Sequence, residues 1–286
     1  MTELGRTIER VLVALDASTE SHAALAAAAN LAARLHVQLV GLFIEDAKLF
    51  DIAQLSMVRQ VSFTGEPSPA PDVESIERSL RAQAGVMRRT LETVAQSHHL
   101  SWSFQTARGR ASAEILASAS HSDLVILGKT TPSVTRRGSL GATARVVAER
   151  PRGAILFSDP RLQRVLGEGG AIVVVFDGSA NAPRALALAA DLAQAGSGEL
   201  IILTPAKDEH DAQRLHDEAG ASLSGRPLRV YHRICTGAGC TALVNATLSH
   251  QGNLLVIGAG SPVLGAESLA DLLERLHSPV LVVDQA

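Results

Sequence analysis

The chain has 286 residues, a formal net charge of −3 at pH 7 and a pI near 6.4; 46% of its residues are hydrophobic but only 3% are aromatic. This length favours two domains, each with its own core built mainly from Ala, Leu, Val and Ile. The near-neutral charge gives no basic surface that would favour nucleic acid, so we expect no nucleic-acid partner.

No run approaches the ~20 consecutive apolar residues that span a bilayer, and residues 1–10 lack the apolar segment of a secretory signal. The two cysteines, Cys235 and Cys240, have neither the partner residues of a metal site nor the number needed for a disulfide framework. We therefore expect buried free thiols, no metal, no membrane partner and a cytoplasmic location.

The first half alternates short apolar runs with helical segments. Such runs are typical of strands covered on both faces of a parallel sheet. The expected strands are 10–16, 38–45, 101–107, 123–128 and 153–158, and the expected helices are 20–35, 72–97, 111–120 and 141–150. With right-handed crossovers, this order predicts a doubly wound five-stranded sheet with helices on both faces.

The second half repeats this plan after a Gly-containing linker at 159–170. The expected strands are 171–177, 199–204, 228–234, 254–258 and 279–284, and the expected helices are 182–195, 208–220, 240–250 and 267–277. We therefore divide the chain into copy one, residues 1–160, and copy two, residues 161–286. Their final strands are apolar and would otherwise be sticky edges, so we expect the copies to pack there about a pseudo-twofold axis.

The two copies also match residue by residue at their beginnings. The segment from Arg10 to Ser18 reads RVLVALDAS, and the segment from Ala171 to Ser179 reads AIVVVFDGS, at an offset of 161 residues. Ala/Leu-rich helical sequences follow at the same offset. A repeat of this period is the size of a small domain and too long for a solenoid unit.

Copy one carries an insertion at about 47–71. Its first part is apolar, and its last part, 65–71, is Pro-rich and is expected to be a loop. A flap packed on its own domain is favoured over a docking surface for a partner.

In an open parallel sheet, ligands bind beyond the carboxyl ends of the strands, where the strand order reverses. In copy one this edge collects Asp16 and Ser18, residues 44–46, residues 128–131, and the start of the helix at Gly141. A helix N-terminus after a glycine is suited to binding phosphate. Arg136 and Arg137, in the loop between, are candidates to add positive charge, and Lys129 is a candidate anion contact.

These features resemble the universal stress protein family. The resemblance covers the whole chain and implies two domains, each with an adenine nucleotide α-hydrolase-like fold. Members that bind ATP carry the motif G-x2-G-x9-G-[S/T] after the fourth strand. In copy one, Gly128 and Gly141 stand at the first and third glycines, but Thr131 replaces the second and Ala142 replaces the Ser/Thr. Thr143 is the next hydroxyl available. The resemblance also implies that Asp16 contacts the adenosine and that Ile44 packs near the adenine.

Copy two retains Gly258 but has Ser261 at the second glycine, and no Gly-Ser follows at the expected spacing. Glu267 and Asp271 near that place would repel phosphate. We therefore expect ATP or AMP to bind in copy one alone, if at all, and copy two to act as a scaffold or dimer surface.

Three functions remain open. The first is a non-enzymatic, cytoplasmic stress-response regulator that requires no cofactor and takes ATP as a candidate ligand in copy one. The second is an interaction protein without nucleotide, which pairs its domains within the chain or as a homodimer and docks an unidentified protein partner. The third, a nucleotide-using hydrolase or transferase, has least support because neither copy supplies paired acid–base residues or a nucleophile elbow.

Overall fold

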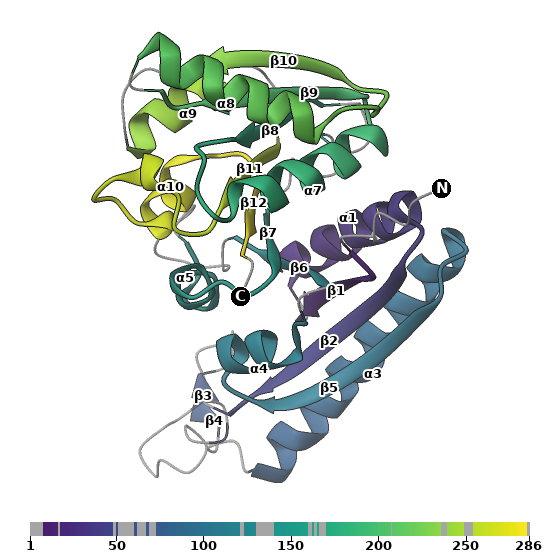
Figure 1. Ribbon diagram of the computed structural model, residues 1–286. Helices are drawn as coiled ribbons and strands as arrows, with labels where there is room; N and C mark the ends of the chain where they lie inside the picture. Colours follow the sequence, from purple (N-terminus) through teal and green to yellow (C-terminus); the bar gives the residue numbers. More distant parts are fainter. Residues whose placement is uncertain are drawn as a thin grey trace.

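The computed structural model (Figure 1) describes most of the chain. The described residues are 8–16, 18–47, 50, 60–61, 67–68, 73–120, 123–129, 140–159, 162, 165, 170–206, 208–235, 239–248 and 254–284.

Copy one forms a five-stranded parallel sheet with the strand order β5-β2-β1-β6-β7. Its elements are β1 (Arg10–Leu15), α1 (Thr19–Leu35), β2 (Gln38–Asp46), α3 (Val73–Ser97), β5 (Trp102–Gly109), α4 (Ala111–Ser118), β6 (Asp123–Gly128), α5 (Ala142–Glu149) and β7 (Ala154–Ser158). The strand order reverses between β1 and β6, so a ligand is expected to bind at the carboxyl ends of these two strands.

Copy two repeats the plan, with the strand order β10-β9-β8-β11-β12. Its elements are β8 (Ile172–Val175), α7 (Ala182–Gln194), β9 (Glu199–Thr204), α8 (Glu209–Ser222), β10 (Arg229–Ile234), α9 (Cys240–Leu248), β11 (Leu254–Gly258), the short 3-10 helix η1 (Pro262–Leu264), α10 (Leu269–Arg275) and β12 (Val280–Val283). Both copies therefore have the doubly wound, five-stranded parallel sheet expected from the sequence, with element ends shifted by a few residues.

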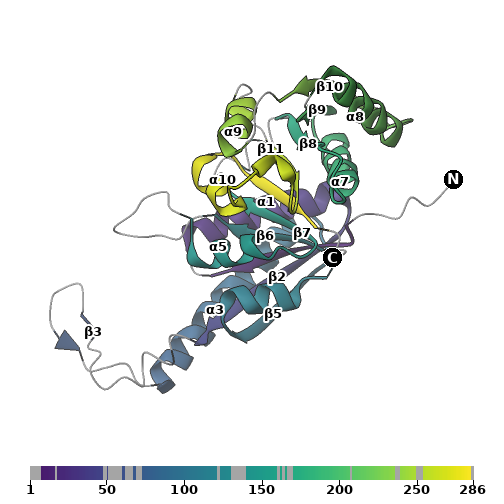
Figure 2. The same ribbon diagram turned by 60° about the vertical axis from the view of Figure 1, so that its left-hand side comes forward.

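The two sheets join into one sheet of ten strands. The join is the antiparallel pair β7–β12, in which Phe157 lies opposite Val280 and Ala154 opposite Val283. Every other pairing in this sheet is parallel. Figures 1 and 2 show the two halves meeting along these strands. The final strands are thus the seam, as the sequence predicts, and we call the β7–β12 pair the seam below.

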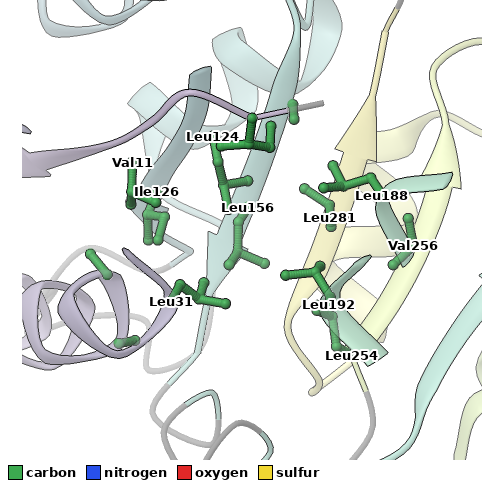
Figure 3. Packing of buried hydrophobic residues seen from close by; sticks show 14 of the residues in the cluster. Val11, Leu31, Leu124, Ile126, Leu156, Leu188, Leu192, Leu254, Val256 and Leu281 are labelled. Atoms are coloured by element: carbon green, nitrogen blue, oxygen red, sulfur yellow. The ribbon is translucent and has the colours of Figure 1, made fainter. Parts of the chain in front are cut away.

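Helices cover both faces of the sheet. The buried residues of α1, α3, α7 and α8 belong to an apolar cluster on one face, and those of α4, α5, α9 and α10 belong to a cluster on the other. Figure 3 shows the first cluster at the seam, where Leu156 of β7 lies near Leu281 of β12, between Leu31 of α1 and Leu192 of α7. Both clusters continue across the seam. The expectation that each copy builds its own core is therefore wrong, because pairing the last strands also brings the flanking helices together.

A half-buried ion pair joins β1 to β6. Arg10 Nε and Nη2 donate to the Asp123 carboxylate at 2.5 and 2.7 Å, and the Asp123 side chain is only 1% exposed. The hydrogen bond to Asp123 raises the pKa of Arg10 above its ordinary value, which keeps the guanidinium charged. The two residues are register partners at the beginning of both strands, whose carboxyl ends frame the candidate site.

Part of the insertion at 47–71 lies outside the described residues. Within the described part, Phe50 packs on the core of copy one, and the Arg108 guanidinium lies 4.6 Å from its ring centroid. Gln60–Val61 (β3) and Pro67–Ser68 (β4) form a two-residue antiparallel ladder, so part of the expected Pro-rich loop is paired strand. The packing of Phe50 agrees with the expectation that the insertion forms a flap on its own domain.

Both cysteines are free and buried, as expected. None of the helices in the described ranges has the length and apolar character required to cross a membrane.

Candidate functional site

A pocket of about 290 Å³ opens at the carboxyl ends of β1, β2 and β6 in copy one. This volume lies at the lower end of the range of ligand pockets. Its lining residues are Ala14, Leu15, Asp16, Ser18, Ser21, Ile44, Asp46, Ala111, Ile115, Leu127, Gly128, Gly141, Thr143 and Ala144. The pocket therefore lies at the strand-order reversal, where the topology places it.

Asp16 is held in position by the start of α1. Its carboxylate Oδ1 accepts hydrogen bonds from the Ser18 amide, at 2.9 Å, and from the Ser18 hydroxyl. The same hydroxyl accepts from the Ser21 amide at 3.1 Å and so caps α1. The second oxygen, Oδ2, makes no hydrogen bond to another described residue, so Asp16 presents one carboxylate oxygen at the pocket.

Two helix N-termini face the pocket. α4 begins after Arg110 and α5 after Gly141, and neither cap residue provides a side-chain hydrogen bond to its helix. The Gly141 amide is bound to the Lys129 carbonyl at 3.0 Å, and Thr143 in the first turn lines the pocket. The free amides and the positive end of a helix dipole attract anions, so a phosphate or carboxylate group fits this side of the pocket.

Most of the site residues expected from the sequence come together here. Asp16, Ile44, Gly128, Gly141 and Thr143 all line the pocket. Ala142 is the exposed first residue of α5 and does not line it. Thr131, Arg136 and Arg137 lie outside the described residues.

Ser21, Ala111 and Ile115, which no sequence motif singles out, also line the pocket. Ser21 shares the polar start of α1 with Ser18. The other two lie on α4, directly after the third strand of copy one. Ligands bind beyond the carboxyl ends of parallel strands, so applying this rule to the third strand as well indicates the start of α4.

Copy two fills the corresponding corner with its own side chains. Asp177 repeats the turn of Asp16, with the Ser179 amide 2.9 Å from its Oδ1, but its Oδ2 accepts a hydrogen bond from the buried Ser261 hydroxyl. Asn181 lies so close to Gly258 that a Cβ on this glycine would be 2.9 Å from the Asn181 Cβ. The Asn181 amide group also donates to the Ala259 carbonyl at 2.8 Å. The route by which a phosphate would approach Gly258 is therefore occupied.

The N-termini of α9 and α10, which correspond to α4 and α5 of copy one, are capped by side chains. Glu267 Oε2 accepts from the Cys240 amide, the first of α9, at 2.5 Å. Ser268 and Asp271 form a reciprocal capping box at the start of α10. The hydrogen bond from the Cys240 amide holds the pKa of Glu267 below its ordinary value, so this cap is charged at neutral pH. Carboxylates thus already occupy the anion-binding positions that are open in copy one.

Comparison with solved structures reveals full-length neighbours. A universal stress protein from Archaeoglobus fulgidus DSM 4304 superposes with a TM-score of 0.71 at 16% identity, covering 97% of this chain and 98% of that chain. The chain has the universal stress protein fold. A putative universal stress protein from Pseudomonas aeruginosa UCBPP-PA14 also matches over 98% of this chain and 94% of its own, with a TM-score of 0.58 and 16% identity. No family model and no curated protein matches the sequence.

The match covers both copies, so the universal stress protein fold occurs twice in this chain, in agreement with the resemblance of its motifs.

In this chain, Lys129 directly follows Gly128, the first glycine of the motif. Its Nζ does not turn to the pocket but donates to the carbonyls of Leu276 and Ser278 in copy two, at 2.5 and 3.0 Å. The expectation that Lys129 contacts an anion is therefore wrong, because the seam offers it helix-terminal carbonyls.

The charge of the pocket is negative. Asp16 and Asp46 line it, and no Lys or Arg stands among the lining residues of the described ranges. Arg108, at the end of the neighbouring β5, is bound to Glu45 at 2.8 Å and to Glu77 at 3.1 Å. The hydrogen bond to Glu45 raises the pKa of Arg108. Anion affinity in the described part of the pocket therefore depends on the amides of α4 and α5 rather than on side-chain cations.

Proposed function

We propose that the chain is a tandem universal stress protein that binds one adenine nucleotide, ATP or AMP, in copy one. In this proposal it acts as a cytoplasmic, non-enzymatic regulator of a stress response and requires no cofactor. The observation that carries the proposal is the contrast between the copies. Copy one has an open pocket with Asp16, Ile44 and the two motif glycines around it, whereas copy two has closed the same corner.

The pocket offers a different partner to each part of a nucleotide. Asp16 Oδ2 can accept hydrogen bonds from a ribose, Ile44 and Ile115 provide apolar surface for a base, and the α5 amides can bind a phosphate. The small volume and the two carboxylates favour a ligand with few phosphates. AMP is therefore the better fit to the described part of the pocket, and ATP needs additional contacts from the loop that follows Lys129.

A non-catalytic role agrees with the side chains present. The described lining contains no His, Cys, Lys or Arg. The Ser18 hydroxyl accepts a hydrogen bond from the Ser21 amide and donates one to Asp16 Oδ1, so both bonds hold it in the turn at the start of α1.

The second candidate function is an interaction protein without nucleotide. Ala142 and the negative lining favour it, because both weaken phosphate binding. The seam strands pair within the chain, so a homodimer in this reading uses another surface.

Mass spectrometry of nucleotide released from the purified, heat-denatured protein separates the two functions. We expect AMP or ATP from the wild type and none from Gly141→Glu, in which a carboxylate enters the pocket beside α5. If neither protein releases nucleotide and neither binds added AMP or ATP, the interaction function is supported instead.

A further inference from the structure

Lys129 joins the two motif glycines of copy one through its main chain. It directly follows Gly128, and its amide donates to the Ser158 carbonyl at the end of β7 at 2.9 Å. Its carbonyl accepts from the Gly141 amide at 3.0 Å. Any movement of the Lys129 backbone therefore moves Gly141 and the start of α5, the anion-binding side of the pocket.

The Lys129 side chain is fixed by copy two. The residue is 5% exposed, and its Nζ bonds to the carbonyls of Leu276, the C-cap of α10, and of Ser278, just before β12. The carbonyl end of a helix carries partial negative charge and binds a cation well. Because a buried ammonium group is costly unless it is hydrogen-bonded, these carbonyls restrict the side chain to this position.

A second contact, on the surface, also joins copy one to α10. Arg145 of α5 forms an ion pair with Glu274 of α10, with side chains 45% and 38% exposed. The start of α5 lines the pocket, while its next turn contacts copy two. The anion-binding helix of copy one is thus connected to α10 through Lys129 inside and through Arg145 outside.

We propose that Lys129 is a positioning residue through which copy two holds Gly128 and Gly141 of copy one ready for the ligand. The proposal rests on the proposed function only for the identity of that ligand. Copy two then regulates the site of copy one without binding nucleotide itself. Because coupling free energies are reciprocal, nucleotide bound in copy one also stabilises the α10–β12 connection.

The test replaces Lys129 by Met, which keeps the length of the side chain but removes the ammonium group. In the nucleotide-free protein we expect the Gly141 amide to exchange with deuterium about tenfold faster than in the wild type. We also expect AMP and ATP to bind about tenfold more weakly, with loss of the ligand-induced protection of residues 276–280. Lys129→Arg, which keeps the charge, should retain most of the wild-type behaviour.

Arg226→Met is the matched control, because it breaks another inter-element ion pair of copy two, Arg226–Asp191 at 2.6 Å, away from the pocket. It should change neither Gly141 exchange nor affinity. Arg145→Met tests the connection from the exposed surface, and we expect it to speed deuterium exchange of the Gly141 amide less than Lys129→Met does. This variant keeps the proposal testable if Lys129→Met does not fold.

The outcomes separate the two proposals. Unchanged Gly141 exchange in the folded Lys129 and Arg145 variants overturns the positioning role, whether or not nucleotide binds. Faster exchange in these variants supports the positioning role, and if the wild type then binds neither AMP nor ATP, only the proposed function fails.

Discussion

Asp16 and Asp177 occupy the same position in the two copies, yet only one of them faces an open pocket. Both accept a hydrogen bond from the amide of the serine two residues later, so the local turn is the same. The difference comes from Ser261, whose hydroxyl binds the second oxygen of Asp177. A single serine, at the position of the second glycine in the resembled motif, is thus enough to satisfy the carboxylate inside the protein.

Ala142 is the residue at which copy one departs most clearly from an ATP-binding motif. It is exposed at the first position of α5, so a hydroxyl there can reach a phosphate at the helix N-terminus. We expect Ala142→Ser to tighten ATP binding by about 1 kcal/mol, or roughly fivefold, because it adds one hydrogen bond. Titration with a fluorescent ATP analogue measures this.

Thr143→Val is the companion variant, since it removes the next hydroxyl while keeping the shape of the side chain. It should weaken binding by a similar factor. The nucleotide account of α5 is contradicted if the two variants bind equally well.

At the scale of elements, one carboxylate that caps a distant helix contributes to the closing of copy two. Glu267 precedes α10 but binds the first amide of α9, where Gly239 has a positive φ and leaves no room for a Cβ beside it. Its charge also contributes, after burial itself, to raising the pKa of the Cys240 thiol to about 11. This thiol is therefore protonated at neutral pH and unreactive.

We expect Glu267→Ala to lower the unfolding temperature at pH 7, because it leaves the α9 N-terminus without its cap. The native pKa of Glu267 is depressed, so its contribution is present above the unfolded value of about 4.3 and is lost as the pH falls through the native value. The difference between variant and wild type should thus shrink as the pH falls below about 4.3 and disappear only below the lower native pKa. Thermal unfolding scans across this pH range measure the difference. A difference that persists in acid contradicts the role of Glu267 as a charged cap.

The packing of α8 on β10 should also lose stability in acid. Here the titrating group is a histidine whose uncharged form is favoured in the native protein. His216 and His232 stack with ring centroids 3.6 Å apart, and among the described residues the buried His232 Nδ1 finds no hydrogen-bond partner. Burial, followed by the charge of His216, lowers the pKa of His232. The unfolded chain therefore binds a proton that the native protein does not.

Stability should fall as the pH drops below about 6.5, the unfolded pKa of histidine, towards the lower native value. His232→Phe removes this titration while keeping a ring in the stack, so its unfolding temperature should change less between pH 7.5 and 5.5. Equal pH profiles for variant and wild type argue against a native pKa below the ordinary one.

The whole molecule combines two copies into one body. The seam pairs β7 with β12 and merges the apolar clusters on both faces, while Lys129 and Arg145 cross it near the pocket. The two copies therefore form an asymmetric pair, in which copy one has an open pocket and side chains of copy two occupy its corresponding corner.

The sequence is sufficient for the succession of strands and helices and for the two doubly wound sheets, because apolar runs, helical periodicity and the repeat depend on neighbouring residues. It also places the pocket, because the carboxyl ends of the strands follow from that order. It does not reveal the direction of the Lys129 side chain or the capping of Cys240 by Glu267, since each contact joins residues far apart in the chain. The shared core was missed for the same reason.

Calorimetric titration with AMP and ATP tests most directly the claim that one open site remains per chain. We predict one bound nucleotide per wild-type chain, none for Gly141→Glu at the start of α5, and an unchanged value of one for Ser268→Glu at the start of α10. Two equivalent sites in the wild type, or binding that survives Gly141→Glu but is lost in Ser268→Glu, would contradict the account.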